Sequence, residues 1–400
     1  MKKILFVLVG ILAGAVVFYL VKITQFYKYI YTPSPRKPAG QKPIAEKEQF
    51  AILLLGYAGG NHAGTYLTDT MIVMHVNKKT KKALLVSLPR DLWVKLPTKS
   101  GDDFYSKINT VYETELFPND FPDLDTKKAG SKSDAELTKR VIGAITGLEI
   151  DNYVSIDFAS FTKAIDILGG VDIKVQKSFE DEKYPVEGKE NDFCGKEEQF
   201  KQIEPYFNDT AASPEAKEKL LKEKPELDEF LRNATDSPQL AFPCRYEKIH
   251  FDAGLQHMDG TTALKFSRSR QSLQDGGDFA RARRQQFLLE AVREKILSVG
   301  FIAKLPALLD ETKNYVKTDI GPDQIQKFLK EVASAKDYSL TSIVLSDQNV
   351  LTTSRSDSGQ YILTPEGGID QWAPVQKFIK DTILGITPSP TFSLTPSPSE

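Results

Sequence analysis

Strand-like and helix-like hydrophobic patterns alternate along residues 49–175, and this alternation limits the fold more than any other feature of the chain. A short apolar run at 50–56 ends in glycine and predicts a buried strand. Two more strands are expected at 70–76 and 82–87, joined by a polar turn that suggests a hairpin. The pattern continues with a helix at 134–146, a strand at 153–156, a helix at 161–168 and a strand at 171–175. We therefore predict an α/β fold, a layered α/β/α domain with a mixed central sheet.

An uninterrupted stretch of uncharged, mostly apolar residues fills positions 4–21, after the initial Met-Lys-Lys. As a helix this stretch would rise roughly 27 Å, close to the thickness of the hydrocarbon core of a bilayer. A cleaved signal peptide usually has an apolar region of only about 7–15 residues that ends in small side chains. This stretch ends in Tyr-Leu-Val at 19–21, although Ala-Gly-Ala at 13–15 leaves cleavage as the alternative. We expect one transmembrane helix, which makes the protein a single-pass protein of the cell membrane.

Composition divides the rest of the chain into segments. Residues 1–3 are expected in the cytoplasm, 4–21 in the membrane and 22–48, which are rich in proline, in an extracytoplasmic stalk. The main domain is expected at 49–300, with charged, proline-interrupted sequence at about 176–246 as an insertion. A C-terminal α/β extension at 301–383 and a disordered Pro/Ser/Thr tail at 384–400 follow.

The chain has two cysteines, Cys194 and Cys244, and both lie in the expected insertion. Two cysteines within one excursion of an exported domain more often form a disulfide, and two unrelated thiols are the alternative. Their spacing is not that of a metal site. If the domain is extracytoplasmic, a disulfide between Cys194 and Cys244 is therefore possible.

Five arginines fall within seventeen positions, although the whole chain carries a net charge of only -2. These residues are Arg268, Arg270, Arg281, Arg283 and Arg284. A general nucleic-acid binder normally has a strongly basic domain, so we expect no nucleic-acid partner. The arginines indicate a local anion site instead.

A long helix is expected at 279–297, and the arginines that open it have a defined spacing. If the helix begins near Asp278, then Arg281, Arg284 and Gln285 lie on one side of its first two turns. Arg283 points elsewhere and is a candidate for plain solvation. The first turn of a helix offers free backbone amides, and guanidinium groups offer paired donors that match phosphate oxygens. This pattern predicts a phosphate site.

Two further arginines precede the helix. Arg268 and Arg270 are separated by one residue, so in extended structure both side chains would project to the same side. They could then form the opposite wall of the phosphate pocket.

A second set of charged residues surrounds the first strands, namely Asp69, Arg90, Asp91 and Lys107. Each has a structural explanation, because Asp69 could cap a turn and Arg90 and Asp91 could form ordinary ion pairs. Together with the arginines they suit a multiply charged phosphate with a divalent cation that offsets the charge on its oxygens.

Six segments in this order resemble the LytR-CpsA-Psr family. They are LLLGYAGG…LTDTMIV, SLPRDLWV, KINTVYE, DILGGVDIKV, GLQHMDGTTALKFSRSR and GDFARARRQQ, within about residues 50–300. The resemblance implies an extracytoplasmic α/β domain on one membrane anchor, with an arginine-lined groove for polyprenyl pyrophosphate and a Mg²⁺ (or Mn²⁺) cofactor. It also implies transfer of a polyprenyl pyrophosphate-linked glycopolymer to a peptidoglycan acceptor.

The resemblance and the residue pattern together assign expected roles to individual residues, and the roles of Asp91, Lys107 and Arg284 come from the pattern. Asp69 would bind the metal, and Asp91 and Asp278 would support the site. The expected catalytic residues are Asp69, Arg90, Arg268 and Arg281. The expected pyrophosphate ligands are Arg90, Lys107, Arg268, Arg270, Arg281, Arg284 and Gln285.

The sequence departs from the family pattern at two positions. Gly-Tyr-Ala at 56–58 stands where the family usually has its first metal aspartate, in a G-x-D segment. Thr68 replaces the customary arginine before Asp69. The metal would then be held by Asp69, phosphate and water, with His62 as a candidate helper.

The expected reaction is phosphoryl transfer, in which an acceptor sugar hydroxyl attacks the carrier-linked pyrophosphate in line and polyprenyl phosphate leaves. Asp69 and Asp91 are the candidates for the base. A hydrolase of the same lipid is one alternative. A membrane-anchored protein that binds lipid pyrophosphate and regulates without turnover is the other, and it is favoured by the missing aspartate.

Overall fold

The computed structural model describes residues 21–22, 25–32, 42–60, 64–126, 135–206, 214–298, 301–314, 316–331 and 336–386. The expected anchor at 4–21 lies outside these ranges except for Val21, and so do His62 and the tail beyond residue 386. Within the described ranges, no helix combines the length and the apolar character needed to cross a membrane.

By its internal contacts the chain divides into two compact units. The first contains the residues up to Ile173, Gln256–Ser267 and the residues from Ala282 onward. The second contains Lys174–Leu255 and Arg268–Arg281.

A six-stranded sheet forms the core of the first unit, with the strand order β11-β6-β1-β2-β3-β12. Its strands are β1 (Gln49–Tyr57), β2 (Thr68–Asn77), β3 (Lys82–Ser87), β6 (Asn152–Asp157), β11 (Val316–Thr318) and β12 (Ser339–Val344). The pairs β1–β2, β2–β3 and β6–β11 are antiparallel, whereas β6 runs parallel to β1 and β12 runs parallel to β3. The predicted mixed central sheet is confirmed.

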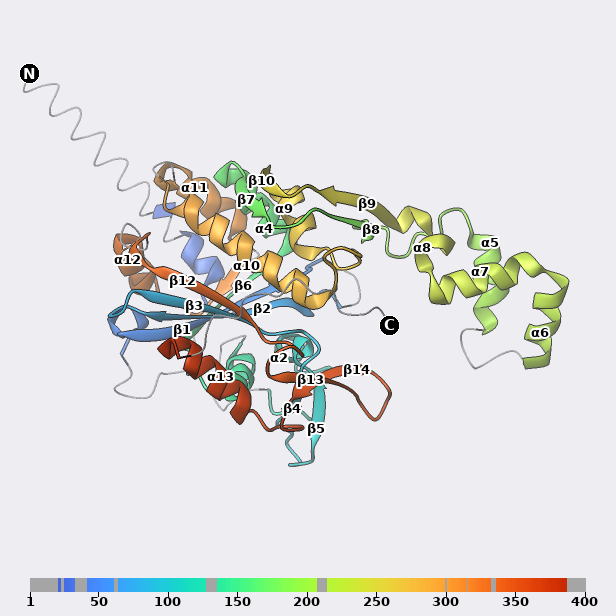
Figure 1. Ribbon diagram of the computed structural model, residues 1–400, viewed down its shortest axis with the longest axis horizontal. Coiled ribbons are helices and arrows are strands. Elements are labelled where there is room, and N and C mark those ends of the chain that lie inside the picture. Colours follow the sequence, from blue (N-terminus) through green and yellow to red (C-terminus); the bar gives the residue numbers. More distant parts are fainter. Residues whose placement is uncertain are drawn as a thin grey trace, which may run out of the picture. The chain divides into compact units, whose positions relative to one another are not determined.

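Helices cover both faces of this sheet (Figure 1). One face carries α4 (Phe158–Leu168), α10 (Gly277–Ile296) and α11 (Phe301–Thr312), and the other carries α2 (Val111–Leu116), α3 (Glu136–Thr146) and α13 (Ala373–Leu384). In β1 only Gln49 is exposed, as expected for a strand that is covered on both sides. The remaining helices of the unit are α9 (Gly260–Arg268) and α12 (Pro322–Glu331). The last residue of α9 and the start of α10, up to Arg281, fall in the second unit.

Helix α4 begins three residues before the predicted start at 161. The Asp157 carboxylate accepts a hydrogen bond from the backbone nitrogen of Ser160 at 2.8 Å, which caps the helix at its amino end. Gly169 follows the helix with a φ of +79°, a left-handed conformation that suits glycine.

The residues after 300 supply both edge strands of the central sheet. β12 pairs with β3 over six residues, and β11 pairs with β6 over three. The boundary expected at residue 300 therefore does not separate two folding units, because the segment at 301–383 completes the sheet that begins at residue 49.

Four short two-stranded sheets complete the strand pairing of the described residues. In the first unit β4 (Trp93–Leu96) pairs with β5 (Phe104–Lys107), and β13 (Leu351–Arg355) pairs with β14 (Tyr361–Pro365). In addition, β7 (Val171–Val175) pairs with β10 (Gly254–Met258). The fourth pair, β8 with β9, belongs to the second unit.

The second unit is built on the antiparallel pair β8 (Phe179–Pro185) and β9 (Tyr246–Phe251). Between these strands lie α5 (Glu197–Ile203), α6 (Pro214–Glu223), α7 (Pro225–Asp236) and α8 (Pro238–Ala241). The insertion expected at about 176–246 is therefore largely regular, although its sequence shows no regular pattern. Pro214, Pro225 and Pro238 stand at helix starts, where proline is favoured because its missing N–H is not needed.

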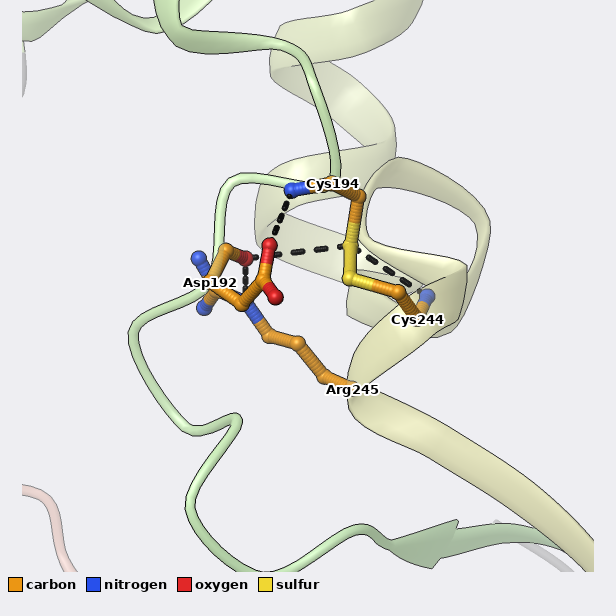
Figure 2. The surroundings of a disulfide bond; sticks show 4 residues. All are labelled: Asp192, Cys194, Cys244 and Arg245. Atoms are coloured by element: carbon orange, nitrogen blue, oxygen red, sulfur yellow. Dashed lines mark hydrogen bonds between the residues drawn. A yellow bond between two sulfur atoms is a disulfide. The ribbon is translucent and has the colours of Figure 1, made fainter.

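A disulfide between Cys194 and Cys244 closes this helical part, with a Cα–Cα distance of 5.6 Å (Figure 2). Asp192 lies beside it and accepts from Cys194 N through Oδ1 at 2.7 Å, while its backbone oxygen accepts from Arg245 Nε at 2.6 Å. The Arg245 guanidinium also lies 3.9 Å from the ring centroid of Phe242. The helical part thus has a covalent link beside its small core of buried apolar side chains.

Candidate functional site

Four charged side chains of the first unit form a chain of ion pairs, which we call the strand-end cluster: Asp69, Arg90, Asp91 and Lys107. Arg90 Nη1 donates to Asp69 Oδ1 at 3.1 Å, and Arg90 Nε lies 3.6 Å from Asp91 Oδ2. Lys107 Nζ donates to Asp91 Oδ1 at 2.6 Å. The Asp91 side chain is 8% exposed, whereas the other three are 25–29% exposed. The cluster is neutral as a whole, and three of its members are open to a ligand.

The ends of neighbouring strands bring this cluster together. Asp69 is the second residue of β2, the Arg-Asp pair lies in the loop after β3, and Lys107 ends β5. Thr68, the residue that replaces the arginine of the family pattern, is fully buried and donates from Oγ1 to the backbone oxygen of Asn109 at 3.2 Å. Asn109 N in turn donates to the backbone oxygen of Arg90 at 3.4 Å. Buried backbone contacts therefore fix the loop that carries the cluster.

A second charged group lies in the second unit, and we call it the arginine group: Arg268, Arg270, Asp278 and Arg281. Asp278 receives two contacts from Arg270, with Nε at 2.7 Å and Nη2 at 3.1 Å, and one from Arg281 Nη2 at 3.1 Å. One carboxylate therefore orients two guanidinium groups, and paired donors of this kind match phosphate oxygens.

Arg268 does not have the extended conformation expected from its spacing. It is the last residue of α9, because the apolar spacing of residues 260–268 is helical and buries Ala263 and Phe266. The Arg268 guanidinium instead lies 5.9 Å from the ring centroid of Tyr184, a cation–π contact. Burial raises the pKa of the Tyr184 hydroxyl, and the nearby Arg268 acts in the opposite direction.

A buried carboxylate that the sequence did not single out holds the segment around Arg270. Asp181 Oδ2 accepts from Ser269 Oγ at 2.7 Å and from the backbone nitrogens of Arg270 and Gln271 at 3.1 Å and 3.0 Å. Asp181 is 1% exposed. Because a buried carboxylate with three donors fixes the loop geometry, Asp181 is a positioning residue for Arg270. In the sequence it stands in the run Glu-Asp-Glu-Lys, which gives no signal for such a role.

Helix α10 begins within two residues of the predicted start, and most of its expected ligands are buried. Arg281 is 5% exposed, Arg284 2% and Gln285 8%, whereas Arg283 is half-buried. Arg284 Nε donates to the backbone oxygen of Phe266 at 2.9 Å, a contact that packs α10 against α9. Arg284 thus has a structural role in this conformation, and its role as a phosphate ligand stays a prediction.

Comparison with known proteins decides the family. A family model described as the LytR_cpsA_psr family matches residues 18–368. The chain belongs to the LytR-CpsA-Psr family. This membership covers the sheet, the strand-end cluster and the arginine group alike.

Several relatives of this LytR-CpsA-Psr protein carry a transferase name. The polyisoprenyl-teichoic acid–peptidoglycan teichoic acid transferase TagU of Oceanobacillus iheyensis is 24% identical over 340 residues, which are 83% of this chain and 80% of TagU. TagV of Bacillus subtilis, with the same transferase name, is 25% identical over 280 residues, or 69% of this chain and 51% of TagV.

Solved structures share the fold of this LytR-CpsA-Psr protein. Protein gbs0355 of Streptococcus agalactiae has a TM-score of 0.52 at 18% identity, covering 86% of this chain and 91% of its own. A structure titled "TagT bound to LI-WTA" has a TM-score of 0.51 at 18% identity, covering 88% and 96%. These similarities establish a common α/β fold with a central mixed sheet.

The LytR-CpsA-Psr resemblance implies a divalent cation. Such a cation would need oxygen ligands from the side chains at this edge of the sheet. At 56–58, where the family usually has G-x-D, Ala58 stands at the aspartate position, and its side chain has no donor atom for a metal. Its neighbour Tyr57 is 7% exposed and stacks on Tyr66 at 5.6 Å between ring centroids. Burial raises the pKa of the Tyr57 hydroxyl well above its usual value, so this group is not an anionic donor. Asp69 is left as the more exposed carboxylate, and Arg90 already binds it.

The described residues therefore do not fit a cation held by two aspartates. Within the ranges that the structure describes, the one group of three ligating side chains consists of Asp192 with Cys194 and Cys244. Their sulfurs form the disulfide and cannot act as thiolate ligands.

Proposed function

We propose that this protein transfers a phosphorylated glycopolymer from a polyprenyl pyrophosphate carrier to a hydroxyl group of peptidoglycan. The proposal rests on family membership and on the transferase names of the relatives. The observation that carries it is the strand-end cluster, in which Arg90 is held between Asp69 and Asp91 and stays partly open. An ordered guanidinium at a strand end is suited to bind a phosphate oxygen with paired hydrogen bonds.

The reaction exchanges one phosphorus–oxygen bond for another. The acceptor hydroxyl oxygen forms a bond to the phosphorus that carries the glycopolymer, and the bridging bond to the carrier breaks, so that polyprenyl phosphate leaves. Arg90 and Lys107 would offset the charge on the phosphate oxygens, which is the main contribution a protein makes to this chemistry. Separately, within the second unit, Asp278 orients Arg270 and Arg281, whose guanidinium groups are further candidates for phosphate binding.

The hydroxyl proton needs an acceptor, and the structure favours Asp69 over Asp91. The Asp69 side chain is 29% exposed, whereas that of Asp91 is 8% exposed and bound by Lys107. A base must be within hydrogen-bond reach of the proton that it takes, and a buried, doubly paired carboxylate is not.

We further propose that the protein is a single-pass membrane protein with an extracytoplasmic body. The apolar stretch at 4–21 and the family membership support this, and so does the disulfide, because disulfides persist mainly in oxidising compartments. Mg²⁺ or Mn²⁺ remains a prediction of the resemblance alone.

An acceptor-dependence assay tests the proposal against its two alternatives. Full-length protein in detergent is given a polyprenyl pyrophosphate-linked sugar, with and without soluble peptidoglycan fragments. We expect polyprenyl phosphate release to rise when fragments are added and the sugar phosphate to appear on them. Release at an undiminished rate without fragments would show a hydrolase. Lipid binding without any release would show a binding or regulatory protein.

A further inference from the structure

The two tryptophans of the chain lie close to one hairpin of the first unit. Trp93 is on β4, and its ring stacks on Tyr105 of β5, with 6.3 Å between ring centroids and 13° between ring planes. Trp372 lines a cavity that the same strand β4 also lines through Lys95. Trp372 is partly exposed at this cavity, and partly exposed aromatic side chains are typical of sites that bind flat or apolar ligand faces.

This cavity has a volume of about 440 Å³ and an open mouth. Its walls are mostly apolar and come from β4, from α3 and from the segment before α13. Three charged side chains interrupt the apolar lining, Lys95, Arg140 and Asp370. A mostly apolar cavity with a few fixed polar groups is the usual form of a small-ligand site.

The polar groups of the cavity are held in defined positions. The Tyr105 hydroxyl donates to Asp370 Oδ2 at 2.6 Å, and Asp370 has a φ of +62°. A non-glycine residue in the left-handed region is uncommon, and such residues concentrate at functional sites. Arg140 is exposed on α3, and no described residue forms an ion pair with it. A guanidinium without an ion pair at a cavity mouth can bind a carboxylate of a ligand.

We propose that this cavity and the stacked pair Trp93–Tyr105 bind the peptidoglycan acceptor, an N-acetylated sugar chain that carries acidic peptides. This proposal rests on the proposed function. Sugar rings present C–H faces that pack on aromatic rings such as Trp372, while hydroxyl and amide N–H groups donate to Asp370. Arg140 pairs with a carboxylate of the peptide. Each group of the cavity thus meets a matching part of this ligand.

The hairpin leads from the cavity to the strand-end cluster. Trp93 pairs with Lys107 across the hairpin, and Lys95 pairs with Tyr105. Residues two apart on a strand face the same side and are separated by roughly 7 Å. The face that carries Tyr105 therefore also carries Lys107, which binds Asp91 of the cluster. A sugar chain on this face can bring one of its hydroxyl groups to the proposed phosphate site.

The charge of the lining favours the acceptor over the donor glycopolymer. Because Lys95 is ion-paired with Asp103, the Arg140 and Asp370 side chains leave the lining close to neutral, which suits a ligand with few charges better than a polymer with one phosphodiester in every repeat. A peptide-bearing amino sugar offers hydrogen-bond donors as well as a carboxylate, so it matches both Asp370 and Arg140. The lining of the cavity therefore fits the peptidoglycan acceptor better than the donor glycopolymer.

Binding of soluble disaccharide-peptide fragments of peptidoglycan to the full-length protein in detergent tests this proposal without any donor lipid. Isothermal titration calorimetry reports the binding, so that no side chain of the proposed site has to serve as the reporter. We expect saturable binding that Trp372→Ala and Arg140→Ala each weaken at least tenfold. Because Arg140 is an exposed helix residue, its variant should fold normally. The matched control is Arg232→Ala, an exposed helix arginine of the second unit that pairs with Asp228.

Three results would overturn the proposal: no saturable binding, equal binding by the wild type and both variants, or displacement of the fragments by polyglycerol phosphate. The outcome is separate from that of the proposed function. Fragment binding that depends on Trp372, with no transfer from donor lipid, would support this acceptor site and contradict the proposed transferase function. Transfer from donor lipid, together with fragment binding that Trp372→Ala does not change, would support the transferase function and contradict this acceptor site.

Discussion

The guanidinium of Arg90 donates to the carboxylate of Asp69 at 3.1 Å, across the gap between the loop after β3 and the start of β2. This pair compensates both charges in the free protein. A bound phosphate would compete with Asp69 for the guanidinium and would leave Asp69 able to accept a proton. The pair thus links substrate binding to the base in the proposed mechanism.

Replacing Arg90 with lysine separates charge from geometry. Lysine keeps the positive charge but lacks the planar, paired donors of the guanidinium. We therefore expect kcat/KM for glycopolymer transfer to fall about 10-fold to 100-fold, less than the roughly 100-fold to 1,000-fold effect of losing a charge-stabilising donor altogether. Thermal unfolding should change little because Arg90 is 27% exposed. Arg232→Lys, at an exposed position in the second unit, is the matched control. Full activity of Arg90→Lys would mean that the site needs only charge.

Removing the amine of Lys107 should destabilise the fold as well as the site. Lys107→Met leaves the carboxylate of Asp91, which is 8% exposed, without its 2.6 Å partner. Arg90 Nε, at 3.6 Å, compensates only in part. We expect the free energy of unfolding in urea to fall by about 2 kcal/mol. The double variant Asp91→Asn with Lys107→Met should recover part of the loss. An unchanged urea midpoint would show that Asp91 does not need Lys107.

Glu115 makes the stability of the first unit depend on pH. Burial raises the pKa of this carboxyl to about 7, although the backbone nitrogens of Leu137 and Thr138 and the Thr138 hydroxyl donate to it. The folded protein therefore holds a proton that the unfolded chain releases near pH 4.5.

The stabilisation that comes from this proton is complete below about pH 4.5 and is lost as the pH rises to about 7. The full effect is on the order of 3 kcal/mol. Between pH 4.5 and pH 8, we expect the free energy of unfolding of the wild type to fall by about 3 kcal/mol more than that of Glu115→Gln. Parallel stability curves for the two proteins would contradict the assignment.

Reduction of the disulfide should loosen the helical part of the second unit. The bond closes a loop with a sequence separation of 50, for which constraint of the unfolded chain contributes about 4 kcal/mol. We expect limited proteolysis with mass spectrometry to find cuts between Cys194 and Cys244 in the reduced protein and in Cys194→Ser. The oxidised protein should resist. Equal cleavage in both states would show that the small core holds this part by itself.

Local patterns predicted the first half of the fold well. The apolar runs of β1, β2 and β3 and the helical spacing of α3 and α4 gave elements whose ends differ from the structure by at most three residues. Deviations came from capping, as at Asp157, which begins α4 earlier than its apolar residues do. The meeting of Asp69, Arg90, Asp91 and Lys107 was also predictable, because all four lie near the ends of strands that are close in sequence.

Long-range pairing could not be predicted in the same way. The strands β11 and β12 are short, and each pairs with a strand more than 150 residues earlier in the chain. The burial of Asp181 against the backbone of Arg270 depends on the same kind of distant contact, 89 residues apart. Trp372 and Arg140 carry no local motif. These features depend on tertiary packing, which hydrophobic periodicity does not contain.

The central claim is phosphoryl transfer from a polyprenyl pyrophosphate carrier, and polyprenyl phosphate release measures it most directly. Full-length protein, Asp69→Ala and Arg281→Ala are compared on a polyprenyl pyrophosphate-linked sugar with peptidoglycan fragments, in magnesium, in manganese and in chelator. We predict release by the wild type that both variants reduce at least 100-fold, while Arg232→Ala releases at the wild-type rate. Tight binding of the lipid by the wild type, with no release under any of these conditions, would contradict the claim.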